Sequence, residues 1–549
     1  MIKHFTLILA LIAVTVTARP QTAQEWQSDL RYLQQKVHSN YSNLFHNISA
    51  ANWNKAVDDF NTEIPKLNNT QVIAGFVKLL ALFHIGHTQM NTWGLHRPAA
   101  SLSLHRYPFR VYWFSDGLYL VGAESKYSDA VGGKILRIGT MKIEDAMEAI
   151  RPLVSCENEQ GYQSNAVYFL AIPEFLYAQG IAPAATEVSV TYQKNNKEQT
   201  VVFAAGSDNQ HFGATGLEAP AGWTMVKTTG ATPLWRKEPN AYRYMEYLAP
   251  SKTLYVRHSV TLNDGSQSIA SFFANMADFI DKNDVQRLIL DIRMNGGGNN
   301  YLNKPIINSI VASRKINQKG KFFCIIGRRT FSAAQNLVNE LEKYTEVTFA
   351  GEPTSENVNF YGDTKTEVLP NSKLEANLSW LWWQNLDPRD RRKATSPELA
   401  ADMRFVDYAR NEDPVLKLIQ EYDTQKPLMP TLSALIQSGK KEEAFQFAIN
   451  YLKDPVHRYT VARLESTIND EGYARMQNNR HEEANAFFEI NTKLFPESAN
   501  AYDSYAESFL NMGKKEEAVK YYEMAIAKDK DGVTKENSIK MLHKIRNGQ

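Results

Sequence analysis

Ser332 is the first residue whose type and setting suggest chemistry. It lies in the segment GRRTFSAAQN, between an apolar run, KFFCII, and a run with helical spacing, AAQNLVNELEKY. A strand, a tight turn and a helix in succession place the turn residue at a sheet edge near the positive helix end, where an oxyanion can be stabilised. Ser332 is therefore a candidate nucleophile. The alternative is that Thr330 or Ser332 only caps the helix that starts at Ala333, and the segment taken alone favours the cap.

Three consecutive glycines, Gly296 to Gly298, end the strand-like run LILDIRMN, about 35 residues before Ser332. Glycines let a backbone approach a ligand closely and point its N–H groups at an oxygen atom. A nucleotide loop would need Lys and Ser or Thr after the glycines, or a GxGxxG that opens a helix, and neither is present. Gly296 or Gly297, together with Ala333, could supply the two halves of an oxyanion hole. The alternative is a flexible turn.

Two histidines, His84 and His87, lie in ALFHIGHTQM at the end of a helical stretch. Histidine is the natural general base near neutral pH. We expect His84, on the apolar side of its helix, to be structural, and His87, just past a glycine, to be the candidate base. The sequence has no H-E-x-x-H or paired-Cys pattern, so we expect no metal and no cofactor.

The aromatic cluster SWLWWQN contains Trp380, Trp382 and Trp383. Alternation in a strand would place Trp380 and Trp382 on one face and Trp383 on the other. Trp380 and Trp382 are candidates to line a substrate pocket for an apolar side chain or a chain end. Packing in a core is the alternative.

The pattern along the chain predicts several units that would position these residues. Apolar residues three and four apart predict a helical region over 24–95. Short β-rich runs with one helix-like stretch, KIEDAMEAIRPLV, predict a β-rich module over 105–205. Strands that alternate with helices predict an α/β layer with largely parallel strands within 206–425. The fold class is therefore multidomain α/β.

The last part of the chain, 433–549, contains an internal repeat. Ala484 and Ala518 are 34 residues apart, and so are Phe488 and Tyr522. This period and its marker residues are typical of tetratricopeptide repeats, in which each helical hairpin hides its apolar face by stacking on its neighbours. The pattern predicts an all-α array whose role is docking or stability rather than chemistry.

The N-terminus predicts export. Residues 1–23 carry a positive start, about 12 apolar residues, and Ala18 and Ala23 as candidate cleavage positions, which is typical of a signal peptide. The apolar stretch is shorter than the roughly 20 residues that span a bilayer, so we expect no integral membrane segment after cleavage. We expect the chain to be periplasmic or secreted, within the general term cell envelope.

Composition excludes some partners and frameworks. Lys plus Arg number 61 and Asp plus Glu 60, a net charge of +1 that gives no electrostatic reason to expect nucleic acid. With only Cys156 and Cys324, a disulfide framework is excluded and a single bridge is left open.

Three motifs follow one another along the chain: LILDIRMNGGGNN, GRRTFSAAQN and AGEPTSENVNFYGD. Together they resemble the tail-specific or C-terminal-processing serine peptidases, a group that includes a branch with the tricorn core and interphotoreceptor retinoid-binding protein. The resemblance covers about Asp29 to Ile419. It implies a Clp/crotonase-like α/β peptidase core, a PDZ-like module at 105–205 that presents substrate, and Ser332 as nucleophile.

The resemblance also bears on the general base. The processing peptidases have a lysine at the position of Asn357, so a Ser-Lys dyad is disfavoured. The tricorn-like branch uses a histidine in a motif ending in His-Thr, which matches His87-Thr88. That branch has a serine beside the histidine, where this chain has Gly86, and an acidic residue late in the domain, for which Asp390 is the candidate. A glutamate common after SAA, and an aspartate two residues before the histidine, are replaced by Gln335 and Ile85.

These observations predict a serine endopeptidase that hydrolyses exported polypeptides or peptides through an acyl-enzyme on Ser332, with His87 as base. The first alternative is a catalytically weak relative that binds apolar ligands or peptides, which the replacements at Gly86 and Gln335 would suit. A crotonase-like acyl enzyme is disfavoured by the signal peptide and by TFSAA. A scaffold built around the repeats, with a protein partner on the array, is a further alternative.

Overall fold

The structure is a computed structural model that describes residues 21–92, 104–206, 217–265, 267–422, 427–529 and 532–547. Most of the predicted signal peptide, 1–20, lies outside the described residues. Among the residues described, no helix is long and apolar enough to cross a membrane.

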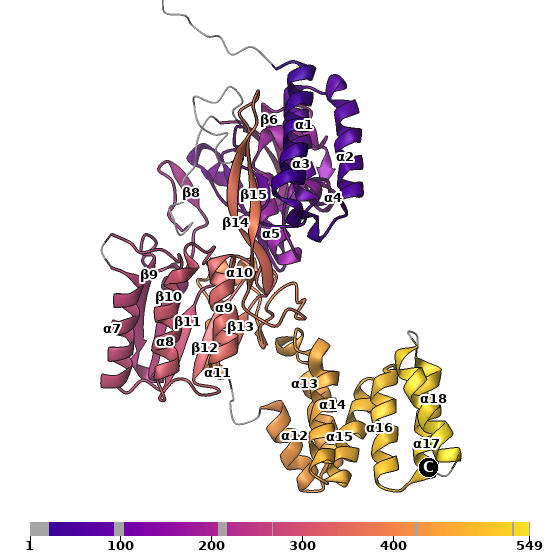
Figure 1. Cartoon of the computed structure of the whole chain (residues 1–549). Coiled ribbons are helices and arrows are strands. Elements are labelled where there is room, and N and C mark those ends of the chain that lie inside the picture. The colour runs from indigo at the N-terminus through magenta and orange to yellow at the C-terminus, as the bar shows by residue number, and fades with distance from the viewer. Residues whose placement is uncertain are drawn as a thin grey trace, which may run out of the picture.

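Three helices open the described chain, where the apolar spacing predicted a helical region. They are α1 (Ala23–Asn40), α2 (Ala50–Glu63) and α3 (Asn69–Ala81). Each begins after a polar residue whose side chain accepts a backbone N–H of the first turn, namely Thr22, Ser49 and Asn68. These caps explain where the three helices of Figure 1 start, and His87 follows α3 in the chain.

The β-rich runs form a seven-stranded antiparallel sheet. Its main path is β2 (Phe109–Phe114), β3 (Gly117–Glu124), β4 (Lys134–Ile138), β6 (Glu187–Lys194) and β7 (Lys197–Ala204), with β5 (Met141–Lys142) beside β4 and β8 (Trp223–Met225) beside β3. Three helices lie between β5 and β6 in the chain: α4 (Ile143–Ile150), α5 (Glu159–Phe169) and α6 (Pro173–Ala178). The predicted strands and the helix-like stretch therefore occur where the sequence placed them.

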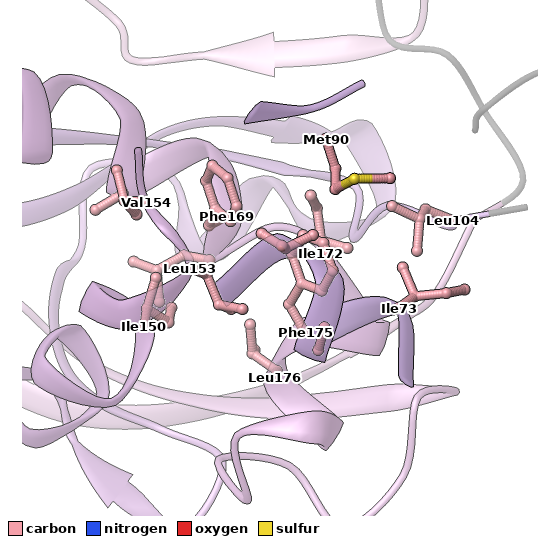
Figure 2. Close-up of a cluster of buried hydrophobic side chains, with 14 of the residues drawn as sticks. Ile73, Met90, Leu104, Ile150, Leu153, Val154, Phe169, Ile172, Phe175 and Leu176 are labelled. Carbon is pink, nitrogen blue, oxygen red and sulfur yellow. The ribbon is translucent and has the colours of Figure 1, made fainter. Parts of the chain in front are cut away.

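One hydrophobic core joins this sheet to the N-terminal helices. Figure 2 shows Ile73 of α3 and Met90 of β1 (Gln89–Met90) beside Phe169, Ile172 and Phe175 of the β-rich region. The sequence placed a boundary between 24–95 and 105–205, and the described residues of the two regions share one core. Because burial of apolar area is the main force that holds such elements together, this shared core holds the β-rich region against the helices that precede His87.

The α/β layer is a six-stranded sheet in the order β16-β13-β12-β11-β10-β9, parallel except for β9. The strands are β9 (Arg243–Leu248), β10 (Thr253–His258), β11 (Arg287–Asp291), β12 (Phe322–Ile326), β13 (Thr348–Gly351) and β16 (Leu399–Ala400). Alternate residues of β11 point to opposite faces of the sheet. On one face, Leu288 packs with α7 (Ile269–Lys282), α8 (Lys304–Ala312) and α9 (Ala333–Tyr344). On the other face, Ile289 packs with α11 (Pro414–Glu421). Helices therefore cover both faces of the sheet, and α10 (Phe405–Ala409) precedes α11 in the chain.

A long hairpin connects the two parts. Its strands β14 (Asn359–Val368) and β15 (Glu375–Gln384) pair antiparallel, and β1 pairs with β15. The hairpin leaves the α/β layer and runs along the N-terminal helices (Figure 1), where Leu374 and Leu378 join their core. The hydroxyl of Tyr41 donates to Glu367 Oε1 at 2.8 Å. The hairpin therefore fixes the region of His87 against the layer that carries Ser332.

The described C-terminal region contains seven α-helices, at the end of the molecule away from α1–α3 (Figure 1). They are α12 (Leu428–Gln437), α13 (Lys441–Lys453), α14 (Val461–Gln477), α15 (His481–Leu494), α16 (Ala499–Asn511), α17 (Lys515–Lys528) and α18 (Val533–Arg546). The repeat markers Ala484, Ala518, Phe488 and Tyr522 are fully buried. An ion pair between Arg458 and Asp402 at 2.6 Å attaches this helical region to the α/β layer.

Candidate active site

Ser332 and the glycine loop lie at the same edge of the α/β sheet. β11 and β12 are neighbouring parallel strands, and the segments that follow them therefore leave the sheet side by side. The turn after β12 is held by Thr330, whose Oγ1 accepts the N–H of Gly327 at 3.1 Å and donates to the carbonyl of Ile292 at 3.1 Å. This buried threonine explains why the turn has one defined shape.

Ser332 has a backbone conformation that is unusual for a serine. Its φ is 56° and its ψ is −125°, in a region where a non-glycine residue is strained by about 1–3 kcal/mol. Although Ser332 immediately precedes α9, its side chain makes no capping hydrogen bond. The turn directs the hydroxyl elsewhere, and the capping alternative does not describe its contacts.

The hydroxyl of Ser332 faces His87. Ser332 Oγ and His87 Nε2 lie 3.0 Å apart, although 245 residues separate them in the sequence. His87 follows α3 and precedes β1, and the next residue, Thr88, is fixed because its Oγ1 accepts the N–H of Ser379 on β15 at 3.1 Å. The geometry suits proton transfer from Ser332 to His87.

The imidazole of His87 is enclosed by two aromatic rings. Phe331 stacks on it with the ring centroids 4.4 Å apart, and Phe360 of β14 is nearly parallel to it at 5.9 Å. The His87 side chain is 14% exposed. The rings restrict rotation of the imidazole and exclude water from most of its surface.

Glu356 completes a line of three side chains. Its Oε1 lies 2.9 Å from His87 Nδ1, and its side chain is fully buried. Its other oxygen, Oε2, accepts the backbone N–H of Ser332. One carboxylate thus orients the imidazole and holds the strained backbone of Ser332 in place.

The structure places Glu356, and not Asp390, against His87. Asp390 is engaged by the guanidinium of Arg392, because its Oδ2 accepts from Nη2 at 2.7 Å and its Oδ1 accepts from Nε at 3.0 Å. Two acceptor oxygens facing one guanidinium form a complete ion pair. The carboxylate of Asp390 is therefore paired with Arg392 and not with His87. The expectation that Asp390 is the acidic partner is therefore corrected. Glu356 immediately precedes Asn357, and the sequence signal that could have found it is an acidic residue in GEPTSEN itself.

A second carboxyl group, Glu157, approaches from the β-rich region. Its Oε1 accepts the N–H of Gly86 at 3.0 Å, and its Oε2 is buried without a hydrogen-bond partner among the described residues. A Cβ atom added at Gly86 would lie 3.0 Å from Glu157 Oε2 and 3.0 Å from the ring of Phe331. The space that a serine beside His87 would need is thus filled by Glu157 and Phe331, which explains the glycine at this position.

Burial and charge act against each other on the pKa of His87. Burial lowers the pKa of His87, but the charges of Glu356 and Glu157 raise it by more, so that it lies above its usual 6.5. Burial raises the pKa of Glu356 above its usual 4.5, and the nearby imidazole only partly offsets this effect. Burial, followed by the charge of Glu356, raises the pKa of Glu157 to about 8.

The glycine loop approaches Ser332 closely. Gly297 has a φ of 107°, and a Cβ atom built on it would lie 2.7 Å from Ser332 Cβ and 3.1 Å from the N of Ala333. The N–H of Gly297, however, donates to Asn295 Oδ1 at 2.9 Å. Gly297 therefore provides the close approach rather than a free donor, while Ala333, as the first residue of α9, has an N–H without an intrahelical acceptor. Gly296 is exposed, and a Cβ atom there would have open space.

His84 has different surroundings from those expected, and the structure also places three further residues, Gln335, Asn357 and Lys365. His84 lies beyond the end of α3, has a φ of 50° and is exposed, so it is not on an apolar face. Gln335 is buried and donates to Asn339 and Thr395 at 2.8 and 3.0 Å. The side-chain oxygen of Asn357 is buried without a partner in the described parts of the chain, and Lys365 lies over the ring of Trp380, 4.6 Å from its centroid.

The register of the hairpin separates the tryptophans. Trp383 lies opposite Phe360, the residue that stacks on His87, whereas Trp382 lies opposite Tyr361 and contacts His46. Directly opposed residues share a face of the sheet. Trp382, and with it Trp380, therefore lies on the face away from Phe360. The expectation that these two line the pocket beside Ser332 is not supported, because strand alternation alone does not reveal which face meets the site.

The two cysteines are both free, so the bridge that the sequence left open is not formed. Across the described ranges, no group of three or more His, Cys, Asp or Glu side chains is arranged to hold a metal ion.

Solved structures with a similar fold exist. Mature CPAF complexed with lactacystin aligns over 76% of this chain and 99% of its own, with a TM-score of 0.51 and 11% identity. A second structure of mature CPAF aligns over 76% and 98%, with a TM-score of 0.50 and 10% identity. The photosystem II D1 C-terminal processing protease aligns over 69% and 93%, with a TM-score of 0.35 and 13% identity. No protein-family description and no curated protein matches the sequence. This chain therefore shares the fold of mature CPAF over about three quarters of its length.

Proposed function

We propose that this chain is a serine endopeptidase that hydrolyses polypeptides or peptides through an acyl-enzyme on Ser332. The observation that carries the proposal is the line formed by Ser332 Oγ, the imidazole of His87 and the carboxylate of Glu356, with contacts of 3.0 and 2.9 Å. A nucleophile, a base and a group that orients the base are the three parts that acyl transfer needs.

In the first half of the reaction, His87 Nε2 takes the proton from Ser332 Oγ while Oγ attacks the peptide carbonyl carbon. The tetrahedral intermediate collapses, the C–N bond breaks, and His87 gives the proton to the leaving amine. In the second half, His87 takes a proton from water, the hydroxide attacks the acyl ester, and Ser332 regains its proton as the acid leaves. Proton and bond changes balance without a metal or cofactor.

Glu356 favours this cycle in two ways. Its Oε1 faces Nδ1 of His87, so the neutral imidazole keeps its proton on Nδ1 and presents Nε2 to Ser332. Its negative charge stabilises the imidazolium that forms when the proton moves. A carboxylate buried this deeply stays charged most readily when protonation of His87 compensates it.

The oxyanion would form beside the start of α9. The backbone N–H of Ser332 already donates to Glu356, so we propose the N–H groups of Ala333 and Gly296 as the donors. Each such donor typically lowers the barrier by about 3 kcal/mol. The positive end of α9 adds a favourable field at the same point.

We also propose that the substrates are exported polypeptides, and that the tail-specific resemblance of the three motifs applies to this chain. Capping of α1 by Thr22 supports cleavage of the signal peptide before that residue, as at Ala18, because cleavage after Ala23 would remove the cap. The region 105–205 would act as the PDZ-like module that presents substrate, and the helical region 433–549 as a tetratricopeptide array for a protein partner.

The mature chain and its Ser332→Ala and His87→Ala variants test the proposal. We expect the wild type to cleave casein and to be labelled on Ser332 by a fluorophosphonate, and both variants to lose cleavage by at least 10³-fold. If the folded wild type neither cleaves casein nor peptides nor reacts with the fluorophosphonate, the proposal is wrong. Full activity of His87→Ala would show that another group is the base, and Lys365 would be tested next.

The alternative of an apolar-ligand binder has less support. A cavity of about 880 Å³ lies beside α11, but its lining includes Asp402, Arg404 and Glu421 and none of the catalytic candidates. Binding of apolar ligands favours cavities lined mainly by apolar side chains. The same wild-type preparation would nevertheless be titrated with retinol, and binding without cleavage would favour this alternative.

A further inference from the structure

Tyr301 is an aromatic residue in an unusual place. It lies in the short helical turn Asn300–Leu302, which follows the glycine loop, and it is 78% exposed. The turn is fixed because Asn299 Oδ1 accepts the N–H of Tyr301 at 3.1 Å. The backbone therefore presents the ring to solvent from a defined position.

Trp383 stands beside Tyr301. The two ring centroids lie 6.2 Å apart with the rings at 74°, an edge-to-face arrangement that is favourable for aromatic pairs. Trp383 is itself held, because its Nε1–H donates to Asp363 Oδ2 at 2.7 Å. Its indole also lies over Gly362, where a Cβ atom would come within 2.9 Å of the ring.

Two separate segments of the chain connect this pair to the candidate active site. Tyr301 comes from the loop that contacts Ser332 through Gly297. Trp383 is opposite Phe360, which stacks on His87.

A third connection consists of hydrogen bonds made by a residue of α9. Asn336, whose N–H donates to the carbonyl of Ser332 at 3.1 Å, accepts from Asn300 at 3.4 Å and donates to Asn385 at 2.6 Å. Asn300, next to Tyr301, and Asn385, two residues after Trp383, are thus bonded to the helix that follows Ser332.

We propose that Tyr301 and Trp383 form an aromatic platform that binds a large apolar side chain, aromatic or leucine-like, of a residue flanking the scissile bond. The inference rests on the proposed peptidase function and names its substrate preference. Two rigid aromatic side chains offer a large contact area at a small loss of conformational freedom. Asp363, bound to the indole, places a negative charge beside the platform and disfavours acidic side chains on the substrate.

Binding tests the platform independently of turnover. The Ser332→Ala protein would be titrated with two fluorescein-labelled peptides of eight residues that differ only in Phe or Ala at the two central positions, with fluorescence anisotropy as readout. We expect the Phe peptide to bind about tenfold more tightly, and Tyr301→Ala in the same background to reduce this preference to about twofold or less. Tyr301→Phe should keep it, because the ring is retained.

Trp380→Ala provides the matched control, since Trp380 is also exposed, at 44%, and lies on the other face of the same strand. It should leave the preference for Phe unchanged. Equal binding of both peptides, or a loss of preference in Trp380→Ala as large as in Tyr301→Ala, would overturn the platform.

Cleavage by active protein separates this inference from the proposed function. Wild type, Tyr301→Ala and Trp380→Ala would digest casein, and mass spectrometry would identify the residues flanking each cut. We expect enrichment of Phe, Tyr, Trp and Leu in wild type and Trp380→Ala, and its loss in Tyr301→Ala. If the wild type is labelled by the fluorophosphonate and Tyr301→Ala has the same cleavage pattern as the wild type, the peptidase proposal stands and the platform is rejected. Absence of labelling and cleavage in wild type would reject the peptidase, and the binding comparison would then decide the platform.

Discussion

Glu157 accepts a hydrogen bond from the backbone N–H of Gly86, the residue that precedes His87, at 3.0 Å. This contact joins the β-rich region to the segment that carries the candidate base. It also brings a second carboxyl group close to Glu356, so that ionisation of either one opposes ionisation of the other.

Glu157→Gln should stabilise the protein at alkaline pH. Because burial raises the pKa of Glu157 to about 8 in the folded chain, the stability that its protonated form contributes is complete below the unfolded pKa, near 4.5, and is lost as the pH rises through about 8. Glutamine stays neutral and can still accept the Gly86 N–H. We expect its Tm to be close to that of the wild type at pH 5 and a few degrees higher at pH 8.5, measured by differential scanning calorimetry. The exposed Glu144→Gln on α4 is the control, and a Glu157→Gln difference that does not grow with pH would contradict the prediction.

Gly86→Ser should lower both stability and activity. The added Cβ would lie 3.0 Å from Glu157 Oε2 and 3.0 Å from the Phe331 ring, and overpacking of this kind costs about 1–3 kcal/mol. We expect a lower Tm and at least tenfold lower kcat/KM. Glu157→Ala would remove one of the two obstacles, so the double variant should be more active than Gly86→Ser alone. An unchanged Tm and activity in Gly86→Ser would show that the site relaxes freely.

The sequence predicted the elements better than the contacts of the site. The strands and helices around Ser332 follow from local apolar patterns, and the coarse expectation of a mixed α/β chain with several sheets and a helical C-terminal region is confirmed. Ser332 and His87 could be selected because each lies in a motif with a recognisable setting, and the structure places their side chains 3.0 Å apart.

The acidic side chains near His87 could be identified only from the tertiary structure. Glu356 lies in the motif GEPTSEN, but the resemblance points to an acidic residue late in the domain, where Asp390 faces Arg392. Glu157 lies 175 residues before Ser332 in a different region of the chain, and no local pattern indicates that the two regions pack together. The faces of Trp380 and Trp383 likewise depend on the hairpin register, which periodicity alone does not provide.

Glu356→Gln should abolish most activity, whereas Asp390→Asn should not. Glutamine keeps the shape of Glu356 but can donate to Nδ1 of His87, which favours the wrong tautomer, and it removes the charge that stabilises the imidazolium. We expect kcat/KM for a fluorogenic peptide to fall by about 10³- to 10⁴-fold. Asp390→Asn should change it by less than threefold, because Asp390 faces Arg392. The reverse order of the two effects would restore Asp390 as the acidic partner.

The acid limb of activity should report His87. The charge of Glu356 and its contact with the imidazole outweigh burial and raise the pKa of His87 above 6.5, and a protonated imidazole cannot accept the proton of Ser332. We expect kcat/KM to fall as the pH decreases, with a midpoint above 6.5. Circular dichroism over the same range serves as the control that the loss is not unfolding. A midpoint below 6 with an intact fold would contradict the net upward shift.

Gly297→Ala should inactivate the site without unfolding the chain. At Gly297 the φ of 107° disfavours any side chain, and the new methyl group would lie 2.7 Å from Ser332 Cβ. Either the glycine loop or the nucleophile must move, and the strained conformation of Ser332 would be the first to give way. We expect fluorophosphonate labelling to slow by at least 100-fold while the Tm falls by only a few degrees. Gly296→Ala is the comparison, since a Cβ there meets no atom within 4 Å and its N–H is retained, and its labelling rate should fall by no more than a few-fold. Equal effects of the two substitutions would mean that the loop moves as a whole, and that the close approach of Gly297 does not set the position of Ser332.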